Sequence, residues 1–260
     1  MSRRMKNKIG IYVVSLLDSS RRINIINQFE KININFEFVD AVNGRLLPQA
    51  IVDSVNNKDV QSRYRRKIGL GEIGCALSHQ KIYQAIAESS VDYAIIFEDD
   101  IQLSDNISAV IEYFKSTAVS LGDKNLYILG GQEGLSSQDL LVRSVKEQIN
   151  VSNDVSFVKL NDSAKYIYRT CSYVVSRDLA KELKCTYDEA FYIADDWNYL
   201  STLGVFKKLY LTNVAYHPED LVGSVIEQER QAKQSSWKRS KLRALLRTCK
   251  SKFRQLKRFY

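Results

Sequence analysis

The chain has 260 residues, of which 45% are hydrophobic and 26% are charged, as in an ordinary soluble globular protein. This length suits one large α/β domain or two small ones, each able to bury a core. The four cysteines contain no C-x-x-C pair and the chain has only two histidines, which argues against a zinc site of the Cys/His type and indicates a reduced, cytosolic chain.

The net charge of +8 is distributed unevenly along the chain. Residues 230–260 contain 12 Lys and Arg and no Asp or Glu, whereas residues 1–229 contain 26 basic and 30 acidic residues, a net charge of −4. We therefore divide the chain into a mildly acidic body, residues 1–228, and a basic tail, residues 229–260. The short apolar stretch at 9–17 is interpreted as a first strand and not as a signal peptide.

Strand and helix patterns alternate along the body. In chain order they predict a strand (8–17), a helix capped by Asp18 or Ser19, a strand (32–41), a short helix (46–56), a mobile polar loop (56–67), a helix (69–89), a strand (92–97), a helix (106–118), a strand (125–131), a polar segment without a clear pattern (135–165), a strand that passes into a helix near Ser176, and a last strand (204–213). This alternation predicts an α/β fold with a mostly parallel sheet, whose ligands bind at the carboxyl ends of the strands.

Three consecutive carboxylates, Glu98, Asp99 and Asp100, follow the apolar strand YAIIF. Like charges side by side are costly unless they are solvated or bound to a cation, and carboxylate oxygens suit Mg²⁺ or Mn²⁺. The triplet is therefore either a solvated turn or a site for a divalent ion that bridges a diphosphate. Its position directly after a buried strand favours the ion.

Three other stretches have both a structural and a functional interpretation. In ADDWNYL, Asp195 or Asp196 is the N-cap of a helix or a general base. GLGEIGCALSH is a possible phosphate cradle at a helix N-terminus, although it matches neither G-x-G-x-x-G nor a P-loop. The run from Ser19 to Arg22 is a solvated first helical turn or a set of phosphate ligands.

Taken together, the motifs resemble those of glycosyltransferase family 25, the lipooligosaccharide-biosynthesis glycosyltransferases. The matching stretches are IYVVSLLDSSRR (11–22), FEFVDAVNG (36–44), GLGEIGCALSHQKIY (69–83), YAIIFEDDI (93–101), YRTCSYVVSRDLAKEL (168–183), ADDWNYL (194–200) and HPEDLVGSVI (217–226). The resemblance implies a GT-A-like, Rossmann-type nucleotide-sugar-binding domain. It also implies metal-dependent transfer of a hexose, galactose before glucose, from a UDP-sugar to a glycan hydroxyl with inversion.

The resemblance also implies roles for individual residues. The metal, Mn²⁺ or Mg²⁺, is expected at Asp100 and Asp99, with His217 as a third ligand, and Asp195 is preferred over Asp196 as the base. The nucleotide-sugar is expected to meet, directly or through support, Ser19, Arg22, Asp40, Ala41, Asn43, Glu72, His79, Glu98 and Asp99. The acceptor is expected to be a lipid-linked oligosaccharide of the lipooligosaccharide or lipopolysaccharide type.

The basic tail has an apolar stripe at helical spacing, formed by Leu242, Leu246, Cys249, Phe253, Leu256 and Tyr260. A basic amphipathic helix suits an anionic membrane surface, which predicts peripheral association with the inner face of a bacterial cytoplasmic membrane. Packing on the body or in a coiled coil is the alternative, and nucleic-acid binding is disfavoured. For the body, the alternatives are a non-catalytic, membrane-associated nucleotide- or glycan-binding protein on the same fold and a phosphohydrolase, which lacks an evident nucleophile.

Overall fold

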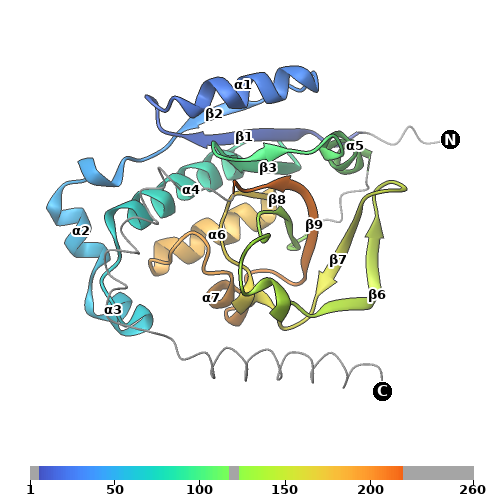
Figure 1. Cartoon of the computed structure of the whole chain (residues 1–260). Helices are drawn as coiled ribbons and strands as arrows, with labels where there is room; N and C mark the ends of the chain where they lie inside the picture. Colours follow the sequence, from blue (N-terminus) through green and yellow to red (C-terminus); the bar gives the residue numbers. More distant parts are fainter. Residues whose placement is uncertain (1–5, 117–122, 219–260) are drawn as a thin grey trace.

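The computed structural model describes residues 6–116 and 123–218, so the tail prediction lies outside the described residues (Figure 1). A 9-stranded sheet has the order β2-β1-β3-β8-β5-β9-β7-β6, and β4 pairs with β9. The strands are β1 (Ile9–Ser15), β2 (Glu37–Asp40), β3 (Tyr93–Glu98), β4 (Gln102–Leu103), β5 (Leu126–Gly130), β6 (Arg143–Asn150), β7 (Ser156–Leu160), β8 (Ser172–Ser176) and β9 (Leu209–Tyr216). The helices are α1 (Arg21–Lys31), α2 (Gln49–Val55), α3 (Lys58–Tyr64), α4 (Leu70–Glu88), α5 (Ile107–Ser116), α6 (Arg177–Glu189) and α7 (Trp197–Thr202), with short 3₁₀ turns η1 (Gly44–Leu46), η2 (Gln138–Leu140) and η3 (Ala164–Tyr166).

The α/β class is confirmed, and the sheet is mixed in its pairing. Strands β2, β1, β3, β5, β9 and β6 point in one direction, whereas β8, β7 and β4 point the opposite way. Strand β8 is inserted antiparallel between β3 and β5, with Ser172 opposite Phe97. Strand β8 therefore begins at the same end of the sheet at which β3 finishes. The residues before β8 thus lie next to the acidic triplet.

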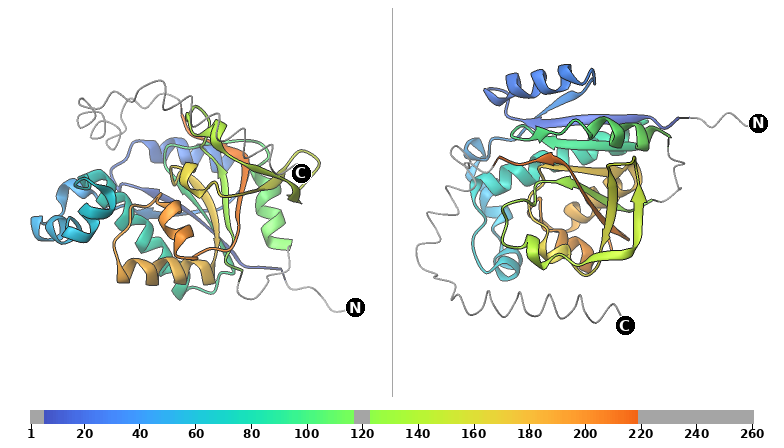
Figure 2. Two further views of the ribbon diagram at one scale, coloured as in Figure 1. Left: turned by 90° about the horizontal axis from the view of Figure 1, so that it is seen from below. Right: turned by 45° about the vertical axis from the view of Figure 1, so that its right-hand side comes forward.

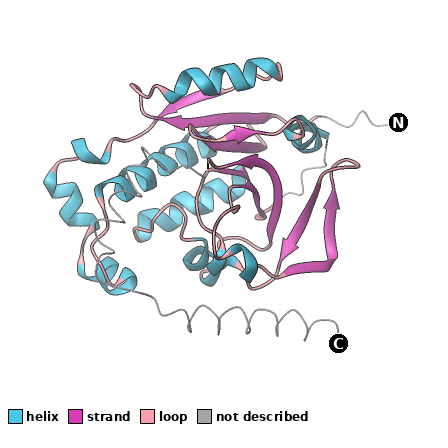
Figure 3. Ribbon diagram, viewed as in Figure 1, coloured by secondary structure: helices cyan, strands magenta, loops and turns pink. Residues whose placement is uncertain are grey.

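Two apolar layers cover the faces of the sheet, because alternate strand residues point to opposite sides. On one side, Val14 and Ile96 pack with the buried side chains of α4 and α6. On the other side, Val13 and Phe97 pack with α1 and α5. The views in Figures 1 and 2 show α1 across the sheet from the adjacent pair α4 and α6. The secondary-structure colouring in Figure 3 shows the resulting helix–sheet–helix layers.

Residues 56–67 were predicted as a mobile loop, and this prediction is wrong, because they contain α3. The side chain of Asn57 caps this helix by accepting a hydrogen bond from the Val60 backbone N–H. Val60 is 2% exposed and packs in a small cluster with Ile68 and Ile73. One buried apolar residue in a polar stretch does not give a recognisable helical pattern in the sequence. In the folded chain, tertiary packing of that residue stabilises this short helix.

The segment 135–165 was predicted to have no clear pattern, yet it forms the hairpin β6–β7. Strand β6 is at the edge of the sheet and its residues are exposed or half-buried throughout. Such a strand lacks the alternation of apolar and polar residues that identifies strands with one buried face. A smaller correction concerns α1, whose N-cap is Ser20 and not Asp18 or Ser19.

No helix within 6–116 or 123–218 combines the length and apolar content that a membrane crossing requires.

Close backbone packing joins η1 to α4. A Cβ on Gly44 would lie 1.8 Å from the Leu70 carbonyl oxygen, and a Cβ on Gly74 would lie 2.5 Å from the Val42 carbonyl oxygen. Ser78 supports the same contact, since its hydroxyl accepts a 2.8 Å hydrogen bond from the Val42 backbone N–H. Glycine is therefore required on both sides because backbone atoms, unlike long side chains, cannot move away.

We expect Gly44→Ala to lower the free energy of unfolding by about 3 kcal/mol, because the new methyl group meets backbone. Gly134→Ala is the control: its Cβ would have nothing within 4 Å, so only its positive φ of 73° opposes the change, at about 1 kcal/mol. Denaturant unfolding of both variants measures the difference. Equal losses would contradict the proposed backbone clash.

Candidate functional site

The acidic triplet lies where β3 ends, and each of its carboxylates has different partners. The Asp99 carboxylate turns toward the end of β1 and the start of α1. Its Oδ2 accepts hydrogen bonds of 2.7 Å from the hydroxyls of both Ser15 and Ser19, and its Oδ1 is 3.4 Å from an Arg21 guanidinium nitrogen. Two hydroxyl donors and a cation thus stabilise the charge of Asp99.

Asp100 is paired with a residue that follows β9. Its Oδ2 is 3.4 Å from Nε2 of His217 and 3.6 Å from Arg21, so the structure brings together two of the residues predicted to bind metal. Burial raises the pKa of the Asp100 carboxyl, but the hydrogen bond and charge of His217 and the charge of Arg21 outweigh it and lower the pKa overall. Burial lowers the pKa of His217, but the hydrogen bond and charge of Asp100 outweigh it and raise the pKa overall.

Glu98 points away from this pair, toward α4 and the segment before β8. Its Oε1 accepts a short hydrogen bond from the Thr170 hydroxyl and is 3.4 Å from Nε2 of His79. His79 is fully buried, and its Nδ1 is 2.6 Å from the Tyr173 hydroxyl. His79 therefore acts on the site through Glu98, as a support.

Sequence reasoning missed three of these contacts, those of Ser15, Thr170 and Tyr173. The signal for Ser15 was available, because β1 is parallel to β3 and pairs Val14 with Glu98, which places Ser15 beside the triplet. Thr170 and Tyr173 depend on the antiparallel insertion of β8, which the sequence pattern does not indicate.

The residues predicted to line the nucleotide pocket gather at the ends of β1 and β2. Arg22 donates to the Ser15 carbonyl at 3.0 Å and forms a 2.5 Å ion pair with Asp40. The Ala41 backbone N–H donates to the same Ser15 carbonyl at 2.8 Å. Asn43 lies further along and caps η1, with its side chain accepting from the Arg45 backbone N–H. Around the end of β1 lie Ser19, Arg22, Asp40 and Ala41, and Asn43 is further away.

Glu72 has a structural role at the start of α4. It is 6% exposed, forms two hydrogen bonds of 2.6 and 2.7 Å with Arg66, and accepts a third from the Gly69 backbone N–H at 3.1 Å. Its carboxylate therefore already accepts a hydrogen bond from a backbone N–H at the start of this helix. The Gly69 N–H is therefore already bonded and Gly74 is used in packing, while the phosphate cradle stays a prediction.

The two later aspartates have distinct environments. Asp196 is the N-cap of α7: it accepts from the Tyr199 backbone N–H at 3.0 Å and, through its other oxygen, from the Tyr64 hydroxyl at 2.8 Å. Asp195 accepts a 3.0 Å hydrogen bond from the Arg169 backbone N–H. Because the next residue, Thr170, bonds Glu98, a single stretch of backbone connects Asp195 to the acidic triplet.

The site can accommodate a divalent cation. Oδ1 of Asp100 is buried and has no hydrogen-bond partner among residues 6–116 and 123–218, although its carboxylate is otherwise paired with His217. Carboxylate oxygens and an imidazole nitrogen are suitable ligands for Mn²⁺ or Mg²⁺. The donor set of Asp99, Asp100 and His217 therefore fits the metal that the sequence predicts.

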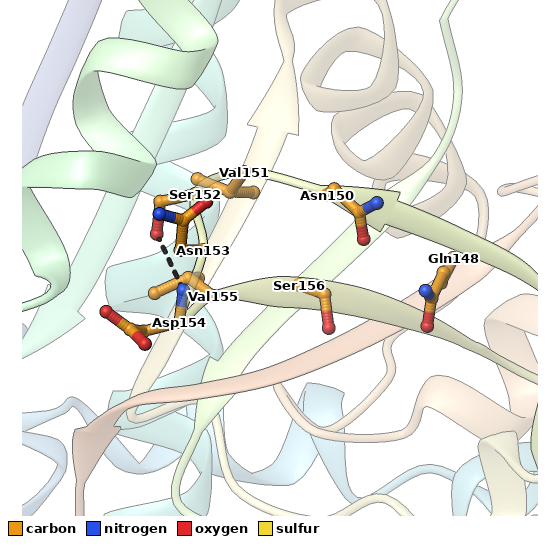
Figure 4. Close-up of a pocket in the computed structure, with 8 residues that line it drawn as sticks. All are labelled: Gln148, Asn150, Val151, Ser152, Asn153, Asp154, Val155 and Ser156. Carbon is orange, nitrogen blue, oxygen red and sulfur yellow. Dashed lines mark hydrogen bonds between the residues drawn. The ribbon is translucent and has the colours of Figure 1, made fainter.

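A hollow elsewhere on the surface is unrelated to these residues. It lies on the β6–β7 hairpin and is lined by Gln148, Asn150, Val151, Ser152, Asn153, Asp154, Val155 and Ser156 (Figure 4). None of these is among the residues of the acidic site, and the lining contains one carboxylate and mainly small polar side chains. Chemical function is therefore assigned to the strand ends and not to this hollow.

The chain is similar to proteins described as glycosyltransferases and to a lipooligosaccharide biosynthesis protein. The chain is 38% identical over 104 residues to a putative glycosyltransferase of Haemophilus influenzae, a match covering 39% of this chain and 36% of that protein. It is 26% identical over 245 residues to lipooligosaccharide biosynthesis protein lic2B of the same species, covering 90% of this chain and 88% of that one.

A third relative is described as catalytically silent. It is the probable inactive glycosyltransferase 25 family member 3 of Rattus norvegicus, 26% identical over 184 residues, covering 66% of this chain and 29% of that protein. The matched regions thus span only about a third of the first and third relatives. The sequence model of glycosyltransferase family 25 (LPS biosynthesis protein) matches residues 8–197, which include the acidic triplet and both later aspartates. The chain belongs to glycosyltransferase family 25.

Proposed function

We propose that the protein is an inverting, metal-dependent hexosyltransferase with a GT-A-like fold. It moves galactose, or next glucose, from a UDP-sugar to a hydroxyl of a lipooligosaccharide- or lipopolysaccharide-type glycan. The observation that carries this proposal is the pairing of Asp100 with His217 at the end of β3, beside an Asp100 oxygen that no residue in the described part of the chain hydrogen-bonds. Membership of family 25 supports the transferase class. Similarity to procollagen galactosyltransferase 1-A of Xenopus laevis, 34% identical over 86 residues, covering 32% of this chain and 14% of that protein, favours galactose.

The donor nucleotide is assigned to the ends of β1 and β2. Arg22 is held over the Phe38 ring, with its guanidinium carbon 4.5 Å from the ring centroid, and is paired with Asp40. Ser19 and Arg21, which now contact Asp99, are close enough to the triplet to meet a diphosphate there. A guanidinium group pairs well with phosphate, so Arg21 can exchange Asp99 for the donor.

Mn²⁺ or Mg²⁺ would be held by Asp100, Asp99 and His217. When bound, the ion offsets the charge of the departing diphosphate. Arg21 reinforces this by placing a second positive charge 3.4–3.6 Å from the same carboxylates. Glu98, turned toward Thr170, orients the end of β3.

Asp195 is the proposed general base. Asp196 is committed to capping α7 and to Tyr64, so removing a proton would compete with two existing hydrogen bonds. Asp195 is positioned by the Arg169 backbone on the segment that also contacts Glu98. In this role its carboxylate takes the proton of the acceptor hydroxyl, whose oxygen then attacks the anomeric carbon opposite the diphosphate.

The basic tail is proposed to bring the enzyme to its acceptor. A cationic helix with an apolar stripe binds anionic lipid surfaces, where a lipid-linked oligosaccharide is located. The protein would then work at the inner face of the bacterial cytoplasmic membrane. A non-catalytic binding protein remains the competing function, favoured by the similarity to an inactive family member.

We expect Asp100→Ala to reduce sugar transfer by at least about 100-fold, because the departing diphosphate loses its stabilisation. Metal-dependent binding of UDP should be lost as well, with the thermal unfolding curve unchanged. Asp105→Ala, which removes an exposed carboxylate two residues beyond β4, is the matched control and should be neutral. Wild-type transfer by Asp100→Ala would overturn the proposed site, and UDP binding without any transfer by the wild type would support the non-catalytic alternative.

Asp195→Asn should lower kcat for transfer by about 10²–10⁴-fold, because an amide cannot accept the proton. The KM for the UDP-sugar should stay within a few-fold, since the donor lies on the other side of the triplet. Asp196→Asn keeps an oxygen for capping α7 and should retain most activity. Steady-state kinetics of the two variants side by side measures this, and a larger loss in Asp196→Asn would reverse the assignment.

Deletion of residues 230–260 should abolish sedimentation with vesicles that contain anionic phosphatidylglycerol, because 12 basic residues are removed. Transfer to a soluble acceptor sugar should be unaffected. Vesicles of neutral phosphatidylcholine are the control and should bind neither form. If both forms sediment equally with anionic vesicles, the tail has no membrane role.

A further inference from the structure

A second group of metal-ligating side chains lies on the opposite side of Glu98 from Asp99 and Asp100. Cys75 and His79 are four residues apart on α4, so they project from the same face of the helix toward the end of β3. One potential ligand atom from each of Cys75, His79 and Glu98 lies within 4.8 Å of the other two. The sequence disfavoured a Cys/His zinc site because the chain has no C-x-x-C pair and only two histidines, whereas in the fold Glu98, on a distant strand, adds a third ligand atom.

The spacing of these atoms suits a metal better than a hydrogen bond. Nε2 of His79 and Oε1 of Glu98 are 3.4 Å apart, whereas a typical N–H···O hydrogen bond is about 2.9 Å. Nitrogen and oxygen ligands bound at about 2.0–2.2 Å to one tetrahedral zinc are about 3.4 Å apart. The histidine and the glutamate therefore already have the separation of two zinc ligands.

Neighbouring tyrosines hold the His79 ring in place. The Tyr173 hydroxyl is 2.6 Å from Nδ1 of His79 and 2.9 Å from the Tyr83 hydroxyl, and all three side chains are buried. If Nδ1 donates to Tyr173, then Nε2 directs a lone pair at the Glu98 carboxylate, an arrangement that a cation between them would stabilise. Metal-binding histidines are commonly oriented in this way through their second nitrogen.

The Cys75 sulfur completes the group from an accessible side. Cys75 is half-buried, and its sulfur is 3.9 Å from the Thr170 hydroxyl, which itself bonds Glu98. In a zinc–thiolate bond the sulfur lies about 2.3 Å from the ion. The Glu98 side chain is 25% exposed, which leaves a path for the ion and a position for water.

We propose that Cys75, His79 and Glu98 bind a zinc-type cation, separate from the ion proposed at Asp100. The ligands are a thiolate sulfur, an imidazole nitrogen and a carboxylate oxygen, with a fourth position open to water. Sulfur and nitrogen ligands favour Zn²⁺, whereas the oxygen-rich set at Asp100 favours Mn²⁺ or Mg²⁺. Binding forms the sulfur–metal bond as the Cys75 thiol releases its proton to solvent. The ion ties α4 to the strand end that bears the triplet, and so positions the triplet.

The test is Co²⁺ titration of the metal-free, reduced full-length chain, followed by absorption spectroscopy. One of the Co²⁺ ions that the wild type binds should show the near-ultraviolet band of thiolate-to-cobalt charge transfer and the visible bands of a tetrahedral ion. Added Zn²⁺ should remove both. Cys75→Ser, which changes one atom, should lose the charge-transfer band. Cys185→Ser is the matched control, because Cys185 is an exposed free thiol on α6, and it should keep the band.

Asp100→Asn separates this site from the proposed transferase metal. It should lose sugar transfer yet keep the thiolate–cobalt band, because Asp100 is not a ligand here. The proposal is overturned if the wild type shows no charge-transfer band, if Cys75→Ser keeps it, or if Cys185→Ser or Asp100→Asn loses it. Far-ultraviolet circular dichroism of each variant confirms that a lost band reflects a lost ligand in a folded chain.

Discussion

Three adjacent carboxylates can end β3 because each is directed to a different part of the fold. Asp99 turns to the hydroxyls at the end of β1, Asp100 to the histidine after β9, and Glu98 to the threonine before β8. Each direction has partners next to a separate strand, and Arg21 pairs with both Asp99 and Asp100, so the three charges are not concentrated at one point. The order of strands around β3 is therefore what makes the acidic cluster compatible with a folded chain.

The antiparallel direction of β8 has the largest effect on this arrangement. A parallel β8 would begin at the opposite end of the sheet and bring Ser176, not Thr170, to the triplet. Because it runs the other way, one short segment supplies the Thr170 hydroxyl to Glu98 and the Arg169 backbone N–H to Asp195. Two acidic motifs that are almost a hundred residues apart in the sequence are thereby joined through one peptide segment.

Local sequence patterns predicted the elements that depend only on residues close together in the chain. The buried run at β3, the helix α4 and the change from strand to helix at Ser176 follow directly from periodicity and capping, and the structure has all three. The direction of β8 and the pairing of Asp100 with His217 could not be predicted in this way, because they depend on how distant segments meet. The same limit applies to α3, whose single buried Val60 acquires its partners only in the folded chain.

For the site residues, motif resemblance and geometry contributed different information. Resemblance selected the acidic triplet and the two later aspartates, placed the metal at Asp100 and Asp99, and preferred Asp195 over Asp196 as the base. Geometry distinguishes them by their hydrogen bonds: Asp196 caps a helix, whereas Asp195 is held by backbone. It also shows that the Glu72 carboxylate binds Arg66 and the Gly69 N–H at the start of α4. These distinctions depend on hydrogen-bond donors supplied by other elements, which no local stretch of sequence contains.

Strand β6 at the edge of the sheet bears on solubility. An exposed edge strand has unpaired backbone groups and can recruit a strand from another molecule. Here Glu147, on β6, forms ion pairs with Lys159 on β7 and with Lys208, just before β9. These charges belong to the outermost hairpin, and they would have to be desolvated before a second chain could add to it. The polar composition that concealed this hairpin in the sequence thus also protects the protein against edge-to-edge aggregation.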